Sequence, residues 1–161
     1  MANTYSQIYI HLVFSPKNRA ALIGKSWKVQ LEKYITGIVQ NKGHKMLAIC
    51  AMPDHIHIFI GYNVVQSIPN LVEEIKTSST AWIKYNKLTK ARFSWQLGCG
   101  AFSYSRSQVD QVIKYILTQE EHHKNVSFRE EYLDMLKKND VAFEEQYLFD
   151  FFARESNSND E

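Results

Sequence analysis

Two histidines separated by one residue, His55 and His57, lie in an apolar, β-branched run that ends at Ile60. Because side chains alternate along a strand, a strand here places both imidazoles on one face. Two neighbouring imidazoles are costly to bury without a partner, and a shared divalent metal ion would supply one. The pair therefore indicates a metal site. Asp54, directly before it, either orients an imidazole or caps the preceding turn.

A second polar pair, Tyr115 and Gln119, is four residues apart in an otherwise apolar segment, so a helix places both on one face. A tyrosine hydroxyl can be a covalent nucleophile, and a glutamine carbonyl can bind a metal ion. A cation held by this oxygen and the two imidazoles could polarise a phosphate while the phenol oxygen attacks phosphorus in line. That reaction leaves a 3′-hydroxyl and a 5′-phosphotyrosine. Packing of the tyrosine at a helix–sheet boundary is the competing interpretation.

Three further histidines have two interpretations each. His11 lies in the middle of an apolar run and is either a hydrogen-bonded core residue or a residue that orients a metal ligand. His122 and His123 follow Gln119 within one turn. They either place positive charge at a helix C-terminus or approach the metal ion or a phosphate.

Charge is divided unevenly along the chain, although the net charge is only +2. Residues 1–119 carry 14 Lys and Arg against 5 Asp and Glu, whereas residues 120–161 carry 5 against 12. A basic body favours a polyanion partner, and a solvated surface is the alternative. Candidate phosphate contacts are Lys84, Lys87, Lys90, Arg92 and Arg106, and candidate stacking residues are Trp82, Trp95, Phe102 and Tyr104. For the aromatic residues, core packing is the competing interpretation.

The spacing of apolar residues predicts the elements that must position these groups. Alternation predicts strands over 4–15, 45–51 and 55–62, and a short strand pair or bent strand over 92–105. Helical spacing predicts helices over 26–41, 67–86, 107–123 and 127–138, the first three capped by Ser26, Ser67 and Ser107. The first six elements follow the β-α-β-β-α-β order of ferredoxin-like folds. We therefore expect an α+β, ferredoxin-like or RRM-like antiparallel sheet, with helices mainly on one face and the histidine pair on a central strand.

Length and composition indicate one domain over residues 1–150, followed by an acidic, disordered tail over residues 151–161. No apolar run reaches the roughly 18 residues of a membrane span, and the chain does not open with a charged segment before an apolar block. We therefore expect a cytoplasmic protein. The two cysteines, Cys50 and Cys99, do not form a disulfide framework.

The run Met52-Pro53-Asp54-His55-Ile56-His57 resembles the histidine–hydrophobic–histidine (HUH) motif with its common Met-Pro-Asp lead-in. Tyr115 with Gln119 is similar to the single catalytic tyrosine and the glutamine four residues after it. With the first strand, 7–14, and the segment 93–96, these residues resemble the single-tyrosine HUH transposases of bacterial insertion sequences, including the REP-associated tyrosine transposases. The resemblance covers residues 4 to 150, nearly the whole chain.

This resemblance implies a metal-dependent endonuclease and strand transferase that acts on single-stranded DNA. By matching positions, His55, His57 and Gln119 would bind the metal ion and Tyr115 would be the nucleophile. The family also implies Mg²⁺ or Mn²⁺, although imidazoles in general suit softer metals. It further implies a bacterial cytoplasmic homodimer, with active sites that can be shared between subunits, that recognises hairpin DNA at the ends of an insertion element.

Other classes explain the residues less well or remain open. Histidine-triad nucleotide hydrolases need a third histidine where Phe59 stands, and two-histidine phosphodiesterases need paired His-x-Thr/Ser motifs. A ferredoxin-like module that binds single-stranded nucleic acid would display sheet aromatics and need no metal ligands. A domesticated transposase that cleaves DNA but no longer moves an element also remains open. Divalent-dependent nicking of single-stranded DNA separates the enzymes from the binding module.

Overall fold

The computed structural model describes residues 4–152, so most of the expected acidic tail, from residue 153 on, lies outside the described residues. The strands are β1 (Tyr9–Phe14), β2 (Lys45–Met52), β3 (His55–Gly61) and β4 (Gly100–Tyr104). The α-helices are α1 (Lys28–Asn41), α2 (Ile68–Tyr85), α3 (Val109–Leu117), α4 (Gln119–His122) and α5 (Phe128–Lys138). Short 3-10 helices cover Arg19–Ala21, Arg106–Gln108 and Glu145–Tyr147.

The strands form one antiparallel sheet in the order β2-β3-β1-β4. The β-α-β-β-α-β order of the chain produces this arrangement, in which β1 and β3 occupy the centre. Val13 of β1 stands opposite His57 of β3. The predicted α+β, ferredoxin-like fold is therefore confirmed, and the His55–His57 run lies on a central strand.

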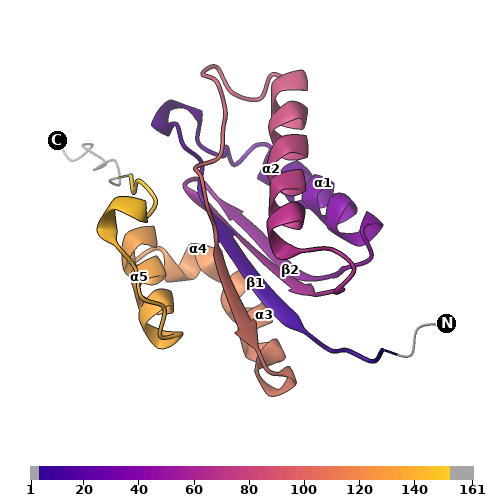
Figure 1. Cartoon of the computed structure of the whole chain (residues 1–161). Helices are drawn as coiled ribbons and strands as arrows, with labels where there is room; N and C mark the ends of the chain where they lie inside the picture. The colour runs from indigo at the N-terminus through magenta and orange to yellow at the C-terminus, as the bar shows by residue number, and fades with distance from the viewer. Residues whose placement is uncertain (1–3, 153–161) are drawn as a thin grey trace.

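The two faces of the sheet differ because side chains alternate along β3. Ile56, Ile58 and Ile60 face α1 and α2, the two longest helices, and belong to the main hydrophobic core. Figure 1 shows these two helices together beside the sheet, with α5 on the side away from them. On the opposite face, Phe59 packs against α3 through residues such as Ile116. The two long helices thus share one face, as expected, while the histidine-bearing face is also covered.

Three predicted elements are shorter or broken in the structure. The first strand, predicted over 4–15, is β1 (Tyr9–Phe14). Of the stretch 92–105, only β4 is a strand, and Trp95 makes an isolated antiparallel bridge to Pro16. The helix predicted over 107–123 is interrupted at Thr118, which separates α3 from α4. The Thr118 hydroxyl donates a hydrogen bond to the carbonyl of Lys114, four residues earlier, at 2.8 Å. Such back-bonding by threonine bends helices, which explains the break.

The predicted helix caps have mixed outcomes. The Ser67 side chain accepts a hydrogen bond from the Asn70 amide at 3.2 Å, which confirms it as the cap of α2. The prediction for Ser26 is wrong, because α1 starts one residue later, after buried Trp27, which makes no side-chain cap bond. Ser107 also does not cap a helix, because it lies inside the 3-10 helix that precedes α3.

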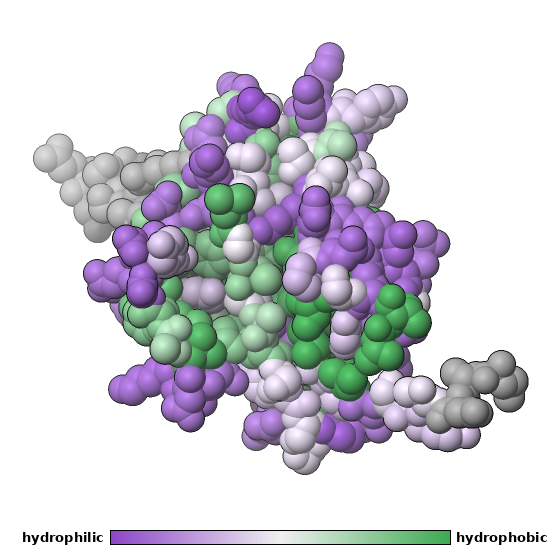
Figure 2. Space-filling model, in the orientation of Figure 1, coloured by the Kyte–Doolittle hydropathy of each residue, from purple (hydrophilic) through white to green (hydrophobic). Residues whose placement is uncertain are grey.

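The surface is mostly hydrophilic on the face drawn in Figure 2, with hydrophobic residues gathered toward its middle and lower part. In the described part of the chain, no helix combines the length and apolarity that crossing a bilayer requires.

Candidate active site

Strand β3 places His55 and His57 on the same face of the sheet, as the alternation predicts, and both side chains are buried. The Nδ1 atom of His55 lies 2.7 Å from Oδ1 of Asp54. Burial raises the pKa of the Asp54 carboxyl, but the hydrogen bond to His55 outweighs it and holds that pKa below its usual value. Asp54 therefore orients the ring of His55 as an ionised acceptor, with the Nε2 atom facing away from it.

His11 does for His57 what Asp54 does for His55. Its Nε2 atom lies 2.7 Å from Nδ1 of His57, and the two rings stack with centroids 5.0 Å apart. Burial lowers the pKa of both imidazoles, so both are neutral at pH 7. Among the described residues, Nδ1 of His11 is the one buried side-chain polar atom without a hydrogen-bond partner. The pair fixes the orientation of His57 and leaves its Nε2 atom facing the cluster described below.

Gln119 is fully buried at the start of α4, and its Oε1 atom lies 3.3 Å from Nε2 of His55. Its side-chain amide donates to the carbonyl of Tyr115 at 3.3 Å. The prediction of one continuous helix through both residues is wrong, because the chain breaks at Thr118. The break nevertheless leaves Gln119 against the first histidine.

Tyr115, near the end of α3, donates its hydroxyl hydrogen bond to Glu131. Its ring lies edge-on to His57, with centroids 5.9 Å apart. Burial, followed by the negative charge of Glu131, raises the pKa of the Tyr115 phenol far above its usual value. The phenol is therefore protonated in this geometry.

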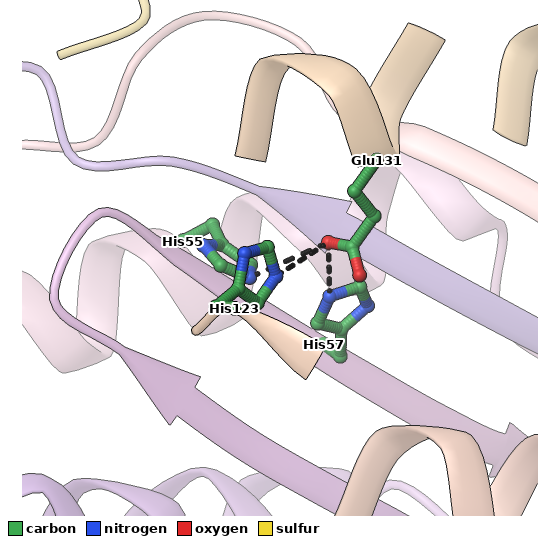
Figure 3. A group of neighbouring side chains, drawn as sticks. All are labelled: His55, His57, His123 and Glu131. Atoms are coloured by element: carbon green, nitrogen blue, oxygen red, sulfur yellow. Dashed lines mark hydrogen bonds and ion pairs between the residues drawn. The ribbon is translucent and has the colours of Figure 1, made fainter. Parts of the chain in front are cut away.

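Three residues that follow Gln119 complete the cluster. Glu131 of α5 is buried, and its Oε1 atom lies 3.0 Å from Nε2 of His57 and 3.2 Å from Nε2 of His123. The same oxygen lies 3.5 Å from Nε2 of His55, and Nε2 of His122 lies 3.4 Å from the other carboxylate oxygen. Figure 3 shows Glu131 reaching down from its helix toward His55, His57 and His123.

The sequence pattern predicts the helix over 127–138, but Glu131 was not among the predicted site residues. One signal was present: Glu131 shares the buried face of α5 with Phe128, Tyr132 and Met135, at helical spacing. A carboxylate on an apolar face needs a partner, and this one has several. Of the two interpretations of the His122–His123 pair, the structure supports approach to the site, because both contact Glu131.

Electrostatics keeps this carboxylate ionised. Burial raises the pKa of Glu131, but hydrogen bonds from His123 and His57 hold it well below its usual value. Burial lowers the pKa of His123, yet the bond to Glu131 raises it overall. The cluster therefore holds one buried negative charge that imidazoles surround.

The cluster fits a divalent cation. One ligand atom each from His55, His57, His123 and Glu131 lies within 4.8 Å of the others. Each imidazole uses Nδ1 for a different contact, which for His123 is the carbonyl of Val126 at 2.6 Å. Proteins orient metal-ligating histidines in this way, and three nitrogens with a carboxylate suit a transition metal. The residues present can therefore hold the metal ion that the sequence predicts.

The predicted DNA contacts separate into two groups. Lys84, Lys87, Lys90 and Arg92 are exposed at the end of α2 and in the loop after it. Asn18 connects this loop to the segment just after β1, because its side chain donates a hydrogen bond to the Arg92 carbonyl at 3.4 Å. That end of β1 pairs with the start of β3. Arg106 lies apart from them, beyond β4, and lines a cavity with the N-terminal segment.

The aromatic candidates mostly pack inside the protein. Trp95 and Phe102 are buried in the main core, which supports the packing interpretation. Trp82 stacks on Tyr34 at 5.1 Å. Tyr104 is partly buried and packs against both the main core and the apolar group of Phe59 and Ile116.

Residues 4–119 match the family described as "Transposase IS200 like". The ISDra2 transposase TnpA of Deinococcus radiodurans is 24% identical over 118 residues, which span 70% of this chain and 84% of that protein. A crystal structure described as a transposase of D. radiodurans R1 superposes with a TM-score of 0.58 and 20% identity, over 74% of this chain and 95% of the other. A REP-associated tyrosine transposase bound to a REP hairpin superposes with a TM-score of 0.57 and 16% identity, over 78% and 74%.

Proposed function

Because the chain belongs to the IS200-like transposase family, we propose that it cleaves and rejoins single-stranded DNA with Tyr115 as the nucleophile. The observation that carries this proposal is the position of the Tyr115 hydroxyl, which is bonded to the carboxylate of a buried imidazole cluster. The proposed metal ligands are His55, His57 and Gln119, with His123 and Glu131 as further donors.

In the proposed reaction, the Tyr115 oxygen attacks the scissile phosphorus and the bond from phosphorus to the 3′ oxygen breaks. The products are a 3′-hydroxyl, which takes up a proton, and a 5′-phosphotyrosine. Attack of another 3′-hydroxyl on this adduct restores a phosphodiester and releases the phenol. A divalent cation held by the proposed ligands would supply Lewis-acid polarisation of the phosphate.

Glu131 has two roles in this proposal. Its Oε2 atom accepts the hydrogen bond of Tyr115 and so orients the phenol oxygen. The same atom is the nearest acceptor for the phenolic proton when the oxygen attacks. Its Oε1 atom bonds to His57 and His123, so one carboxylate joins the nucleophile to the metal-binding side chains.

Of the two metals that the family implies, the donor set favours Mn²⁺ over Mg²⁺. Imidazole nitrogens dominate the cluster, whereas Mg²⁺ is usually held by oxygen atoms and water. Affinity for nitrogen donors is higher for transition metals such as Mn²⁺.

The expected homodimer need not share its active sites. Tyr115 already lies beside His57 of its own chain, so we propose a site completed within one subunit. A dimer would then contain two complete active sites, one in each subunit.

We propose that the substrate is a single strand next to a hairpin end of an insertion element. The fold relative bound to a REP hairpin supports a hairpin partner. The exposed cations of the loop after α2 lie at the end of the sheet where the histidine strand begins, so they can contact phosphates near the site.

A nucleic-acid-binding module without catalysis is the weaker candidate. Such modules stack bases on aromatic side chains of an open sheet face. Here the corresponding face is covered by α3, and Phe59 and Phe102 are buried. No specific observation favours this candidate over cleavage.

The proposal is tested by incubating the protein with labelled single-stranded element-end DNA and Mn²⁺ or Mg²⁺, followed by a denaturing gel. We expect a covalent protein–DNA adduct with the wild type and no adduct with Tyr115→Phe, which retains the ring but lacks the nucleophilic oxygen. Tyr85→Phe is the matched control, because Tyr85 is exposed at the end of α2. An adduct with Tyr115→Phe would refute the assignment, and metal-independent binding without any adduct would favour the binding module.

A further inference from the structure

A groove of about 540 Å³ runs between α3 and α5 and reaches the candidate nucleophile. Gln111 and Tyr115 line it from α3, and Asp134 and Lys138 line it from α5. Tyr115 and Glu131, which are bonded to each other, both line it, so a group bound at that part of the groove lies beside the phenol. The reaction proposed above leaves this space unused.

The groove has apolar walls below a polar rim. Val112 of α3 and Met135 of α5 are buried, and Tyr104 of β4 adds an aromatic ring to the lining. Gln111 and Asp134 are exposed at the opening. Apolar and aromatic walls with a few polar groups are the usual surroundings of a bound small molecule, and an aromatic heterocycle suits such walls.

The charge of the groove argues against a phosphate inside it. Away from the metal-binding cluster, Glu130 and Asp134 supply carboxylates, whereas the cation Lys138 is already paired with Asp134 at 2.8 Å. A phosphate would meet this negative charge at short range. A neutral base would not, and carboxylates accept hydrogen bonds from the amino group of cytosine, while glutamine amides pair with adenine.

We infer that this groove binds one unpaired nucleobase adjacent to the scissile phosphate, with preference for an amino-bearing base over thymine. This inference rests on the proposed cleavage of single-stranded DNA. Its geometry follows from the groove itself: the phosphate stays at Tyr115 and the adjacent base turns into the space between the helices. The wall formed by α5 lies beyond residues 4–119, so the subsite depends on a part of the chain that the family match does not include.

The test scans a single abasic residue through an element-end oligonucleotide. Binding is measured with Tyr115→Phe and Mn²⁺, so that cleavage is not required. We expect affinity to fall about tenfold at one position, in keeping with the loss of one stacked base. Wild-type product lengths then show whether this position adjoins the cleaved phosphate.

Two groove variants test which residues recognise the base. Gln111→Ala and Asp134→Asn, both at exposed positions, should narrow the ratio of affinities for cytosine and thymine at the sensitive position. Gln30→Ala, at an exposed position of α1, should leave this affinity ratio unchanged.

The inference is overturned if no position is sensitive, if the sensitive position lies away from the cleaved phosphate, or if both groove variants keep the wild-type ratio. These outcomes are distinct from failure of the proposed function. If the proposed cleavage fails, DNA binds with the expected base dependence, but the wild type forms no adduct.

Discussion

Glu131 is the one carboxylate among the four donor side chains of the cluster. It contacts the nucleophile candidate Tyr115 through one oxygen, and His57 and His123 through the other. Because a metal ion carries positive charge, a buried anion beside the imidazoles stabilises the bound state more than a neutral amide would.

We therefore expect Glu131→Gln to weaken Mn²⁺ binding by about 10- to 100-fold, as loss of metal-supporting groups usually does. Isothermal titration of the metal-free protein with Mn²⁺ measures this change. Glu73→Gln, at an exposed position of α2, is the control and should bind as the wild type does. Equal affinity in the Glu131 and Glu73 variants would contradict a role of Glu131 in the metal site.

At this scale, sequence predicts what depends on local spacing. Strand alternation predicts that His55 and His57 lie on the same face, and β3 of the structure has them there. Glu131 comes from another element, 74 residues after His57. No spacing rule connects two elements before their packing is known, so this contact could not be predicted from the chain alone.

Among the elements, β4 and α5 approach each other closely at Gly100. A Cβ atom on Gly100 would lie 2.9 Å from Cε2 of Tyr132 and 3.0 Å from Cε2 of Phe102. Both aromatic rings are buried, so neither can simply turn into solvent. The absence of a side chain at Gly100 thus sets the distance between α5 and the sheet.

We expect Gly100→Ala to lower the free energy of unfolding by about 1–3 kcal/mol, the usual cost of overpacking. Gly37→Ala should instead raise it by about 0.4–1 kcal/mol, because Gly37 is helical and a Cβ atom there would meet nothing within 4 Å. Urea unfolding of the two variants measures both changes. A neutral Gly100→Ala would show that α5 is free to shift away from β4.

Element types and order were predictable because the apolar periodicity extends over whole helices and strands. The residues at which helices and strands begin and end were less predictable. The break between α3 and α4 lies at Thr118, whose hydroxyl bonds to the carbonyl of Lys114, and α1 starts directly after the buried Trp27. Such tertiary and side-chain effects leave the periodicity unchanged, so the sequence pattern does not reveal them.

For the molecule as a whole, the buried ionisable groups make stability depend on pH. The pKa values of His11 and His57 are lowered in the folded protein, so only the unfolded chain binds protons as the pH falls below about 6.5. The pKa of Glu131 is also lowered, so its contribution is present above about 4.5 and is lost as the pH falls. His123, with its raised pKa, acts in the opposite direction.

The metal-free protein should therefore lose stability steadily between pH 7 and pH 4. Urea unfolding midpoints at several pH values measure this loss. Glu131→Gln should flatten the part of the curve below pH 5, whereas Glu73→Gln should follow the wild type. A wild-type midpoint that is constant over this range would contradict the assigned pKa directions.

The separation of 74 residues between His57 and Glu131 also has a consequence for the chain as it is made. At usual rates of translation, a ribosome needs roughly 4–15 s to add that length. During part of this interval β1 also lacks its neighbouring strand β4, because Tyr9 pairs with Tyr104. The nascent chain thus contains the imidazoles of His55 and His57 seconds before it contains the carboxylate that joins them to the tyrosine.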